Sequence, residues 1–186
     1  MSRQNLLVGK NIADRYCITG EIGGGGMGRV YSAIPFSDPS QTVAIKVIER
    51  NRLDYEDVLR FQREAALMSR LRHPNIIAFH ELGLYRPEGP DGSTVVGGYY
   101  IVMEVAQGHD LKESLVKGGR KRLDFFFELG LQVSAALEYT HAKNIIHRDI
   151  KPQNIIIERS NDSEGGLLVK VLDFGIARLG DLDLYS

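Results

Sequence analysis

The chain has 186 residues, of which 43% are hydrophobic and 25% are charged, and its formal net charge is −1. These proportions predict one globular domain with a sizeable core, and they give the chain no general attraction for nucleic acid or an anionic membrane. The single cysteine, Cys17, rules out an internal disulfide. No apolar run reaches the roughly 18 residues of a membrane-spanning helix. The N-terminus also lacks a signal-peptide core, so we expect a cytoplasmic chain without a membrane segment.

The first half of the sequence is rich in strand patterns. Strands are expected at residues 16–22, 29–34 and 42–48, because apolar residues alternate with polar ones between turn signals. A helix is expected over 54–71, where apolar residues recur at helical spacing. His73-Pro74-Asn75 then ends that helix, since the residue before a proline avoids the helical conformation.

A second hairpin is expected from residues 76–84 and 99–105. The intervening segment, 86–98, is rich in Pro, Gly, Asp and Ser. It fits either a regulatory insert or a solvated hairpin loop, and its composition favours the loop.

The character of the sequence changes near 104–108, after which helical patterns dominate. Asp110 is placed to cap a short helix that ends near 118–119. A longer helix is expected over 123–141, and short strands at 155–157 and 168–172 flank a polar loop. The apolar face of the longer helix is expected to carry Leu129, Val133, Ala136 and Thr140.

A run of glycines between the first two strands, residues 23–30, fits the pattern G-x-G-x-x-G-x-V. A dinucleotide fold would place a helix after these glycines, whereas residues 29–33 have a strand pattern. A Walker loop is excluded because Arg-Val follows Gly28 in place of Lys-Ser/Thr. The remaining interpretations are a glycine-rich hairpin folded over nucleotide phosphates and a merely flexible hairpin.

Lys46 lies on the apolar strand Val43-Ala44-Ile45-Lys46. Burying a lysine costs free energy unless an anion pairs with it, and Glu64, on the inward face of the following helix, is the best candidate. Glu56 and Asp57 also carry carboxylates, but they sit at the helix start and suit its dipole. Taken singly, Lys46 also fits a snorkelling surface lysine and Glu64 an exposed helix charge.

The most informative segment is residues 147–154, His-Arg-Asp-Ile-Lys-Pro-Gln-Asn, which is followed by Asp-Phe-Gly at 173–175. Together they supply two carboxylates, an ammonium and an amide, which is the set that phosphoryl transfer from ATP requires. Asp-Phe-Gly alone is common and fits a turn that closes a strand. The two motifs in this order are much more specific.

With these motifs the chain resembles the eukaryotic-like (Hanks-type) bacterial serine/threonine protein kinases, from about Tyr16 to the chain end. The resemblance implies an α+β, kinase-like bilobal fold, with a lead-in at 1–15 and a complete N-lobe at 16–105 made of an antiparallel sheet plus one helix. Residues 106–186 would form a partial helical C-lobe. The implied cofactors are ATP and Mg²⁺, and the implied partners are signalling proteins that accept phosphate on Ser or Thr.

By the same resemblance, Asp149 accepts or orients the proton of the substrate hydroxyl, and Lys151 stabilises the γ-phosphate. Asn154 and Asp173 bind Mg²⁺. Lys46 and Glu64 complete the catalytic set. The position of Lys151, two residues after Asp149, is similar to that in Ser/Thr kinases, and Arg148 beside Asp149 is similar to the subset controlled by activation-loop phosphorylation.

The resemblance also implies a nucleotide pocket. Met103 would be the gatekeeper, and the backbone of Glu104 and Ala106 would hydrogen-bond adenine. Val30, Ala44 and Ile156 would sandwich the ring, and the phosphates would lie under Ile22, Gly23, Gly24, Gly25, Gly26, Met27, Gly28 and Arg29. A regulatory spine would stack Met68, Phe79, His147 and Phe174. Each of these apolar residues, taken singly, is equally compatible with plain core. The remaining histidines have no metal-ligand spacing.

The sequence stops eleven residues after Gly175, before the Ala-Pro-Glu motif and the C-terminal helices of the family. Three interpretations follow: the N-terminal portion of a kinase, a nucleotide-binding module that no longer transfers phosphate, and an interaction fragment that pairs with a separate C-terminal kinase portion. The intact motifs favour the first. We expect the 186-residue chain alone to show little or no kinase activity, because substrate docking elements are missing.

Overall fold

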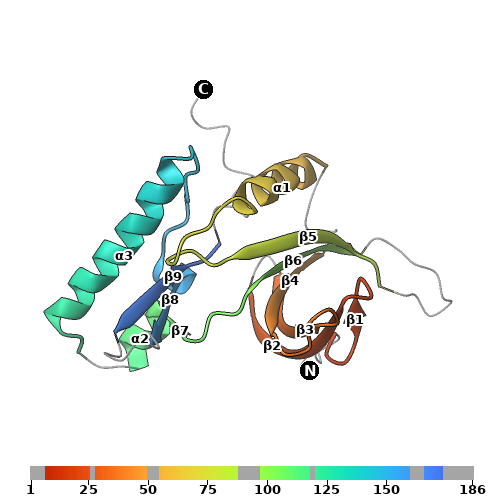
Figure 1. Ribbon diagram of the computed structural model, residues 1–186, viewed down its shortest axis with the longest axis horizontal. Helices are drawn as coiled ribbons and strands as arrows, with labels where there is room; N and C mark the ends of the chain where they lie inside the picture. Colours follow the sequence, from red (N-terminus) through yellow and green to blue (C-terminus); the bar gives the residue numbers. More distant parts are fainter. Residues whose placement is uncertain are drawn as a thin grey trace. The chain divides into compact units, whose positions relative to one another are not determined.

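The computed structural model describes residues 7–25, 28–49, 55–87, 97–117, 120–159 and 166–173. The chain separates into two compact units, shown in Figure 1, and each is described by itself. The first unit comprises residues 1–65 and 79–105. The second comprises residues 66–78 and 106–186. The second unit is therefore built from two separate stretches of the chain.

The first unit is a six-stranded antiparallel sheet in the order β1-β2-β3-β4-β6-β5. Its strands are β1 (Asn11–Ile12), β2 (Tyr16–Gly25), β3 (Gly28–Pro35), β4 (Val43–Glu49), β5 (Phe79–Tyr85) and β6 (Gly98–Glu104). The single helix α1 (Tyr55–Met68) begins in this unit. The kinase-like sheet with one helix that the sequence predicts is thus confirmed.

Two residues of the predicted lead-in, Asn11 and Ile12, already belong to the sheet. Asn11 and Ile12 form β1, which pairs with β2 through a tight turn. Ala13 and Asp14 reverse the chain there with positive φ angles of 53° and 52°. Ile12 is 1% exposed and packs into the core, so the sheet begins earlier than the apolar pattern alone suggested.

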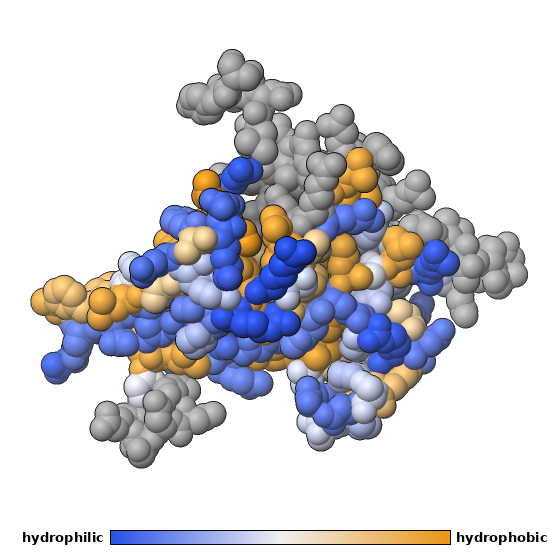
Figure 2. Space-filling view, turned by 45° about the horizontal axis from the view of Figure 1, so that its top comes forward, coloured by the Kyte–Doolittle hydropathy of each residue, from blue (hydrophilic) through white to orange (hydrophobic). Residues whose placement is uncertain are grey.

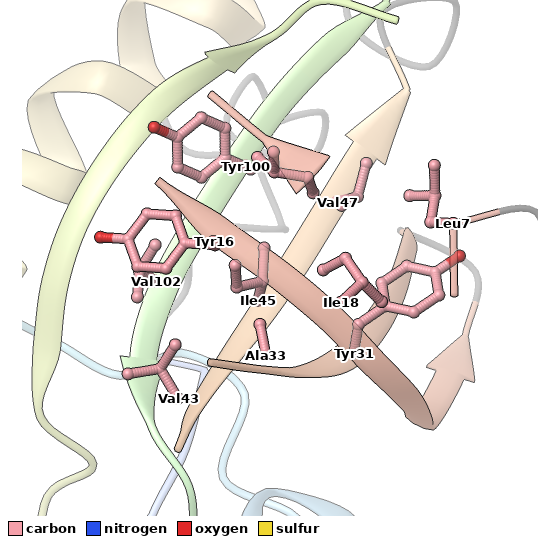
Figure 3. Packing of buried hydrophobic residues seen from close by; sticks show 11 residues of the cluster. Leu7, Tyr16, Ile18, Tyr31, Ala33, Val43, Ile45, Val47, Tyr100 and Val102 are labelled. Carbon is pink, nitrogen blue, oxygen red and sulfur yellow. The ribbon is translucent and has the colours of Figure 1, made fainter. Parts of the chain in front are cut away.

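The core of the first unit lies on one face of the sheet. Alternation along β4 directs Val43, Ile45 and Val47 into a cluster with Tyr31 and Ala33 on β3, as Figure 3 shows. Ile45 is fully buried, and truncating such a residue to alanine typically costs about 2–5 kcal/mol. The opposite face of the same strand carries Ala44 and Lys46.

Two element boundaries differ from the sequence pattern for identifiable reasons. The helix α1 ends at Met68 and not at 71, because the chain turns there and the Ser69 hydroxyl donates to the carbonyl of Ala66 at 2.8 Å. The strand β5 begins at Phe79 and not at 76, because residue 76 pairs in parallel with Val171 in the second unit.

The second unit contains a three-stranded sheet in the order β7-β8-β9, with helices beside it. Its elements are β7 (His109–Asp110), α2 (Leu111–Lys117), α3 (Leu123–His141), the 3₁₀ turn η2 (Pro152–Asn154), β8 (Ile155–Arg159) and β9 (Leu167–Val171). Asp110 caps α2 as predicted, since its Oδ1 accepts from the backbone N–H of Glu113 at 2.7 Å.

The helix α3 has the bounds that the sequence predicted, and it lies alongside β9 (Figure 1). Leu129 and Val133 pack against buried Val169 of β9, and Ala136 and Thr140 are buried on the same helix. Apolar residues spaced three and four apart make this buried stripe.

The other side of α3 exposes apolar residues, which gather at its N-terminal end at the left of Figure 2. The exposed residues are Leu123, Phe126, Phe127 and Leu131. Within the part of the chain that the structure describes, no helix is long and apolar enough to cross a membrane.

Candidate active site

The loop between α3 and β8 carries the predicted catalytic residues Asp149 and Lys151 and the predicted Mg²⁺ ligand Asn154. Asn144, with φ of 59°, turns the chain back after α3, and Arg148, with φ of 61°, bends it again just before Asp149. Positive φ is uncommon outside glycine and often marks a functional loop. The 3₁₀ turn η2 then returns the chain to β8.

Asp149 receives two side-chain donors from its own loop. Lys151 Nζ lies 2.6 Å from Asp149 Oδ2, and Asn154 Nδ2 lies 3.0 Å from the same oxygen. Asn154 Nδ2 also donates to the backbone carbonyl of Asp149 at 2.9 Å. Asn154 is buried, whereas the Lys151 side chain is 46% exposed. The structure therefore brings a carboxylate, an ammonium and an amide together in one short loop.

His147 anchors the base of this loop and is only 1% exposed. Its Nε2 lies 2.8 Å from the carbonyl oxygen of Leu172, which can only accept, so Nε2 carries the proton. Its Nδ1 is then an acceptor, 3.3 Å from the backbone nitrogen of Asp149. Burial lowers the pKa of His147 below its usual value, which matches a neutral imidazole in this tautomer.

Asp173 is tied to the same loop through the residue that precedes it. Besides accepting from His147, Leu172 donates its N–H to the carbonyl of Asn154 at 2.8 Å. Asp173 then has φ of 49°, a left-handed conformation that aspartate tolerates better than most residues. The structure thus connects the second predicted carboxylate to the segment that holds the first.

The donor set at this loop suits a hard divalent cation. Both of the Asn154 side-chain bonds described above use Nδ2, so the amide oxygen is the atom suited to a metal ion, alongside the Asp173 carboxylate. Oxygen ligands of this kind are preferred by Mg²⁺, which also keeps several waters. Within the described ranges, no three His, Cys, Asp or Glu side chains gather as a metal cluster.

The nucleotide-contact residues predicted in the first unit share one face of its sheet. Val30 on β3 is directly opposite Lys46 on β4, and Ala44 is directly opposite Met103 on β6. Residues two apart on a strand, and residues directly across a ladder, point to the same side. The register therefore places Val30, Ala44, Lys46 and Met103 together, opposite the buried cluster of Figure 3.

The glycine-rich segment forms a hairpin between β2 and β3. A strand follows the glycines, with Gly24 opposite Arg29 and Gly25 opposite Gly28, and this excludes the dinucleotide-fold alternative. Gly28 has φ of 145°, and a Cβ there would overlap the carbonyl oxygen of Val47, so only glycine fits. The Arg29 guanidinium pairs with Glu21 across the hairpin at 3.0 Å.

The other predicted site residues are Ile22, Glu104, Ala106 and Ile156, together with some that lie outside the described residues. Ile22 lies at a break in the β2–β3 register and is 54% exposed. Glu104 ends β6, Ala106 follows it, and Ile156 lies on β8. Some predictions lie outside the described residues: those for Gly26, Met27, Phe174 and the side chain of Glu64.

Two functional candidates were missed by the sequence reasoning. Buried Asn75 and partly buried Gln132 form an amide network with β9, in which Asn75 Nδ2 lies 2.6 Å from Gln132 Oε1. The available signal was a glutamine within the otherwise apolar stripe of α3, one position before Val133. Polar residues inside such a stripe require internal partners.

Comparison with known proteins agrees with this geometry. The family model for the protein kinase domain matches residues 16–183. The chain belongs to the protein kinase family. Among its relatives, a probable serine/threonine-protein kinase of Lactococcus lactis, PknB, is 38% identical over 175 residues, which is 93% of this chain but 25% of that protein.

Solved kinase structures are also similar to this chain. The PknI kinase domain of Mycobacterium tuberculosis matches with a TM-score of 0.72 and 28% identity, over 91% of this chain and 62% of that one. Rad53 residues 1–466, in complex with AMP-PNP, match with a TM-score of 0.68 and 31% identity, over 93% of this chain and 40% of that one. The kinase chain described here thus spans only part of each relative.

Proposed function

We propose that this chain supplies the nucleotide-binding and catalytic residues for ATP-dependent transfer of the γ-phosphoryl group to Ser or Thr hydroxyls of proteins. The observation that carries the proposal is the Asp149 cluster, in which Lys151 and Asn154 both reach Asp149 Oδ2. Phosphoryl transfer depends mainly on positioning and charge stabilisation, and a loop that holds these three groups within hydrogen-bond distance supplies both.

In the proposed step, the substrate hydroxyl oxygen forms a bond to the γ-phosphorus while the bond from that phosphorus to the β–γ bridging oxygen breaks. ADP leaves, and the hydroxyl proton passes to the Asp149 carboxylate. The Lys151 ammonium, 2.6 Å from Asp149 Oδ2 in this structure, offsets the charge on the transferred group. Asn154 keeps the carboxylate oriented.

The first unit would bind the nucleotide. Val30 and Ala44 would contact the adenine, Lys46 would pair with the phosphates, and the hairpin at 23–30 would cover them. Their common face on the sheet supports this assignment. The solved structure of Rad53, which is similar over most of this chain, holds the ATP analogue AMP-PNP. By the resemblance to protein kinases, Ala106 and Ile156 in the second unit remain predicted adenine contacts.

Mg²⁺ would be held by Asn154 Oδ1 and the Asp173 carboxylate, and when bound it would neutralise phosphate charge. The chain's own contribution is to fix these two ligands. Asn154 is fixed by its bonds to Asp149. Asp173 is fixed by the bonds of Leu172 to His147 and to the backbone of Asn154.

A second candidate function is nucleotide binding without transfer. The chain spans 25% of PknB and 62% of the PknI chain, and this candidate requires only the nucleotide site. The predicted ATP and Mg²⁺ ligands all fall inside the matched region, whereas the determinants of protein substrates remain unidentified. Under this candidate, MgATP binds but its γ-phosphate is retained.

The two candidates are separated by a binding measurement on the 186-residue chain and a transfer measurement on a chain completed with the C-terminal helices of the kinase family. Binding of a fluorescent ATP analogue with and without Mg²⁺ tests the nucleotide site. Transfer of labelled γ-phosphate to a generic Ser/Thr substrate, with Asp149→Asn as the negative control, tests the reaction. Binding with Asp149-dependent transfer supports the kinase. Binding without transfer supports the second candidate, and absence of Mg²⁺-dependent binding contradicts both.

A further inference from the structure

The strand β9 is the last strand of its sheet, with β8 on one side only. We use the term outer edge for the backbone groups of Leu167, Val169 and Val171 that bond away from β8. An unpaired edge leaves N–H and C=O groups that are costly to bury without partners. In this chain the outer edge is satisfied by residues from α3 and from the segment before β5.

The first part of the outer edge is paired with a side chain. Gln132 Nε2 donates to the carbonyl of Leu167 at 2.7 Å, and Gln132 Oε1 accepts from the N–H of Val169 at 2.8 Å. A primary amide thereby presents the donor and acceptor that a neighbouring strand would present. Gln132 Nε2 also donates to Glu128, one turn earlier on α3, at 2.8 Å.

Asn75 continues the pairing toward the end of the strand. Its Nδ2 donates to the carbonyl of Val169 at 2.9 Å and to Gln132 Oε1 at 2.6 Å. Its own carbonyl accepts from the N–H of Val171 at 2.9 Å, and Ile77 N–H donates to the carbonyl of Val171 at 3.0 Å. The outer edge is thus paired as far as the last residue of β9.

The two residues that follow β9 belong to the candidate active site. Leu172 bonds to His147 and Asn154, and Asp173 is the proposed Mg²⁺ ligand. Asp173 follows the last residue of β9 by two positions, so the place where the strand ends determines where the backbone of Asp173 lies. We propose that Gln132, together with Asn75, is a positioning residue that sets the place of Asp173 for Mg²⁺. This inference rests on the proposed function.

The test uses two substitutions of Gln132 that perturb the edge differently. Gln132→Glu replaces the donor to Leu167 with an acceptor and also faces Glu128 with a like charge. Gln132→Met keeps the length of the side chain but leaves both edge groups without a partner, and it adds no charge. When a metal-binding carboxylate loses the residues that hold it in place, the affinity for the metal ion typically falls by about 10- to 100-fold.

The readout is the Mg²⁺ concentration that gives half-maximal binding of N-methylanthraniloyl-ATP to the full 186-residue chain. Both variants are expected to raise that concentration by about tenfold and to leave analogue affinity in EDTA unchanged. Gln62→Glu, at an exposed position of α1, makes the same chemical change on an element that does not contact β9 through Gln132. Val133→Ala, next to Gln132 on α3, lowers stability through packing alone.

A tenfold rise in both Gln132 variants, absent in Gln62→Glu and in Val133→Ala at matched stability, supports the inference. Equal shifts in Gln132→Met and Val133→Ala at matched stability, or no shift, overturn it. If the wild-type chain shows no Mg²⁺-dependent binding, the proposed function is contradicted, whatever the role of Gln132.

In that case hydrogen exchange of the Leu172 amide tests the positioning role of Gln132. The inference requires faster exchange in both Gln132 variants than in Val133→Ala, and equal exchange overturns it.

Discussion

Asn154 Nδ2 holds Asp149 at two points, since it donates to the backbone carbonyl of Asp149 at 2.9 Å and to the carboxylate oxygen Oδ2 of Asp149 at 3.0 Å. Asn154 is buried and its own N–H bonds to the carbonyl of Lys151 at 2.9 Å. The orientation of the proposed proton acceptor is therefore built into the loop before any substrate arrives, which is the preorganisation that transition-state stabilisation requires.

Asp149 and Asp173 are expected to serve separable roles. In a chain completed with the C-terminal helices of the kinase family, Asp149→Asn should lower phosphoryl transfer by about 10²- to 10⁴-fold, because the proton acceptor is lost while the shape is kept. It should leave nucleotide affinity nearly unchanged. Asp173→Asn should instead weaken Mg²⁺-dependent binding, because a charged oxygen ligand is lost. Transfer assays and binding titrations on the same preparations check this. Equal loss of the same property in both variants would contradict the assignment.

Lys46→Met should weaken MgATP binding by about ten- to a hundredfold, because a hydrogen bond to a charged group is worth about 1.5–3 kcal/mol. Lys10→Met is the matched control, since Lys10 lies in the same unit with an exposed side chain. Isothermal titration gives both affinities. If the two variants bind equally well, Lys46 has no role at the phosphates.

If Lys46 and Glu64 form an ion pair, the effects of their substitutions on nucleotide affinity should be non-additive in a double-mutant cycle.

The stability of the second unit should fall at acidic pH because His147 is buried in its neutral form. Its pKa is lowered from 6.5, so below about pH 6.5 the unfolded chain binds a proton that the folded chain resists. The stabilisation is fully present above pH 6.5 and is lost as the pH falls toward the lowered folded value, by up to about 1.4 kcal/mol per pH unit.

Chemical denaturation between pH 7.5 and 5.5 measures this slope. The pKa of His73 is lowered as well, through burial, so the informative comparison is with His147→Gln, which retains His73. The variant should have a flatter profile than the wild type. Parallel profiles would show that His147 contributes nothing to the acid sensitivity.

Two glycines of the same hairpin should differ in their tolerance of alanine. Gly28→Ala should cost about 1–3 kcal/mol, because it forces a strained φ and a Cβ would overlap the carbonyl oxygen of Val47. Gly23→Ala should change stability by less than about 1 kcal/mol, since open space surrounds its Cβ position. Thermal unfolding distinguishes them, and similar losses in both would argue against the described hairpin geometry.

Local patterns predicted most elements of the fold because the spacing of apolar residues records which face is buried. The bounds of α3 followed from Leu129, Val133 and Ala136, which do lie on its buried side. The catalytic loop was also predictable, since its residues cluster within a few positions. The start of β5 was misplaced because Ile76 pairs with Val171, and no local pattern contains such a partner.

The amide network was also beyond local reasoning. Gln132 and Asn75 meet only in the folded unit, where Gln132 Oε1 is 2.6 Å from Asn75 Nδ2. A sequence shows that a polar residue interrupts an apolar stripe, but it does not show which backbone groups that residue serves. The exposure of Ile22 could not be predicted for a similar reason. This residue lies at a break in the register of β2 and β3, which depends on how the two strands pair.

The pairing of Asn75 with Val169 joins residues that are 94 positions apart, and the whole of β5 and β6 lies in the chain between them. During synthesis Asn75 emerges early, and its partner follows only after the rest of the first unit and the second unit through β8 have been made. Contacts of such long range slow folding because loop closure precedes any gain. We therefore expect the second unit to fold after the first, and its apolar residues to stay exposed for longer during synthesis.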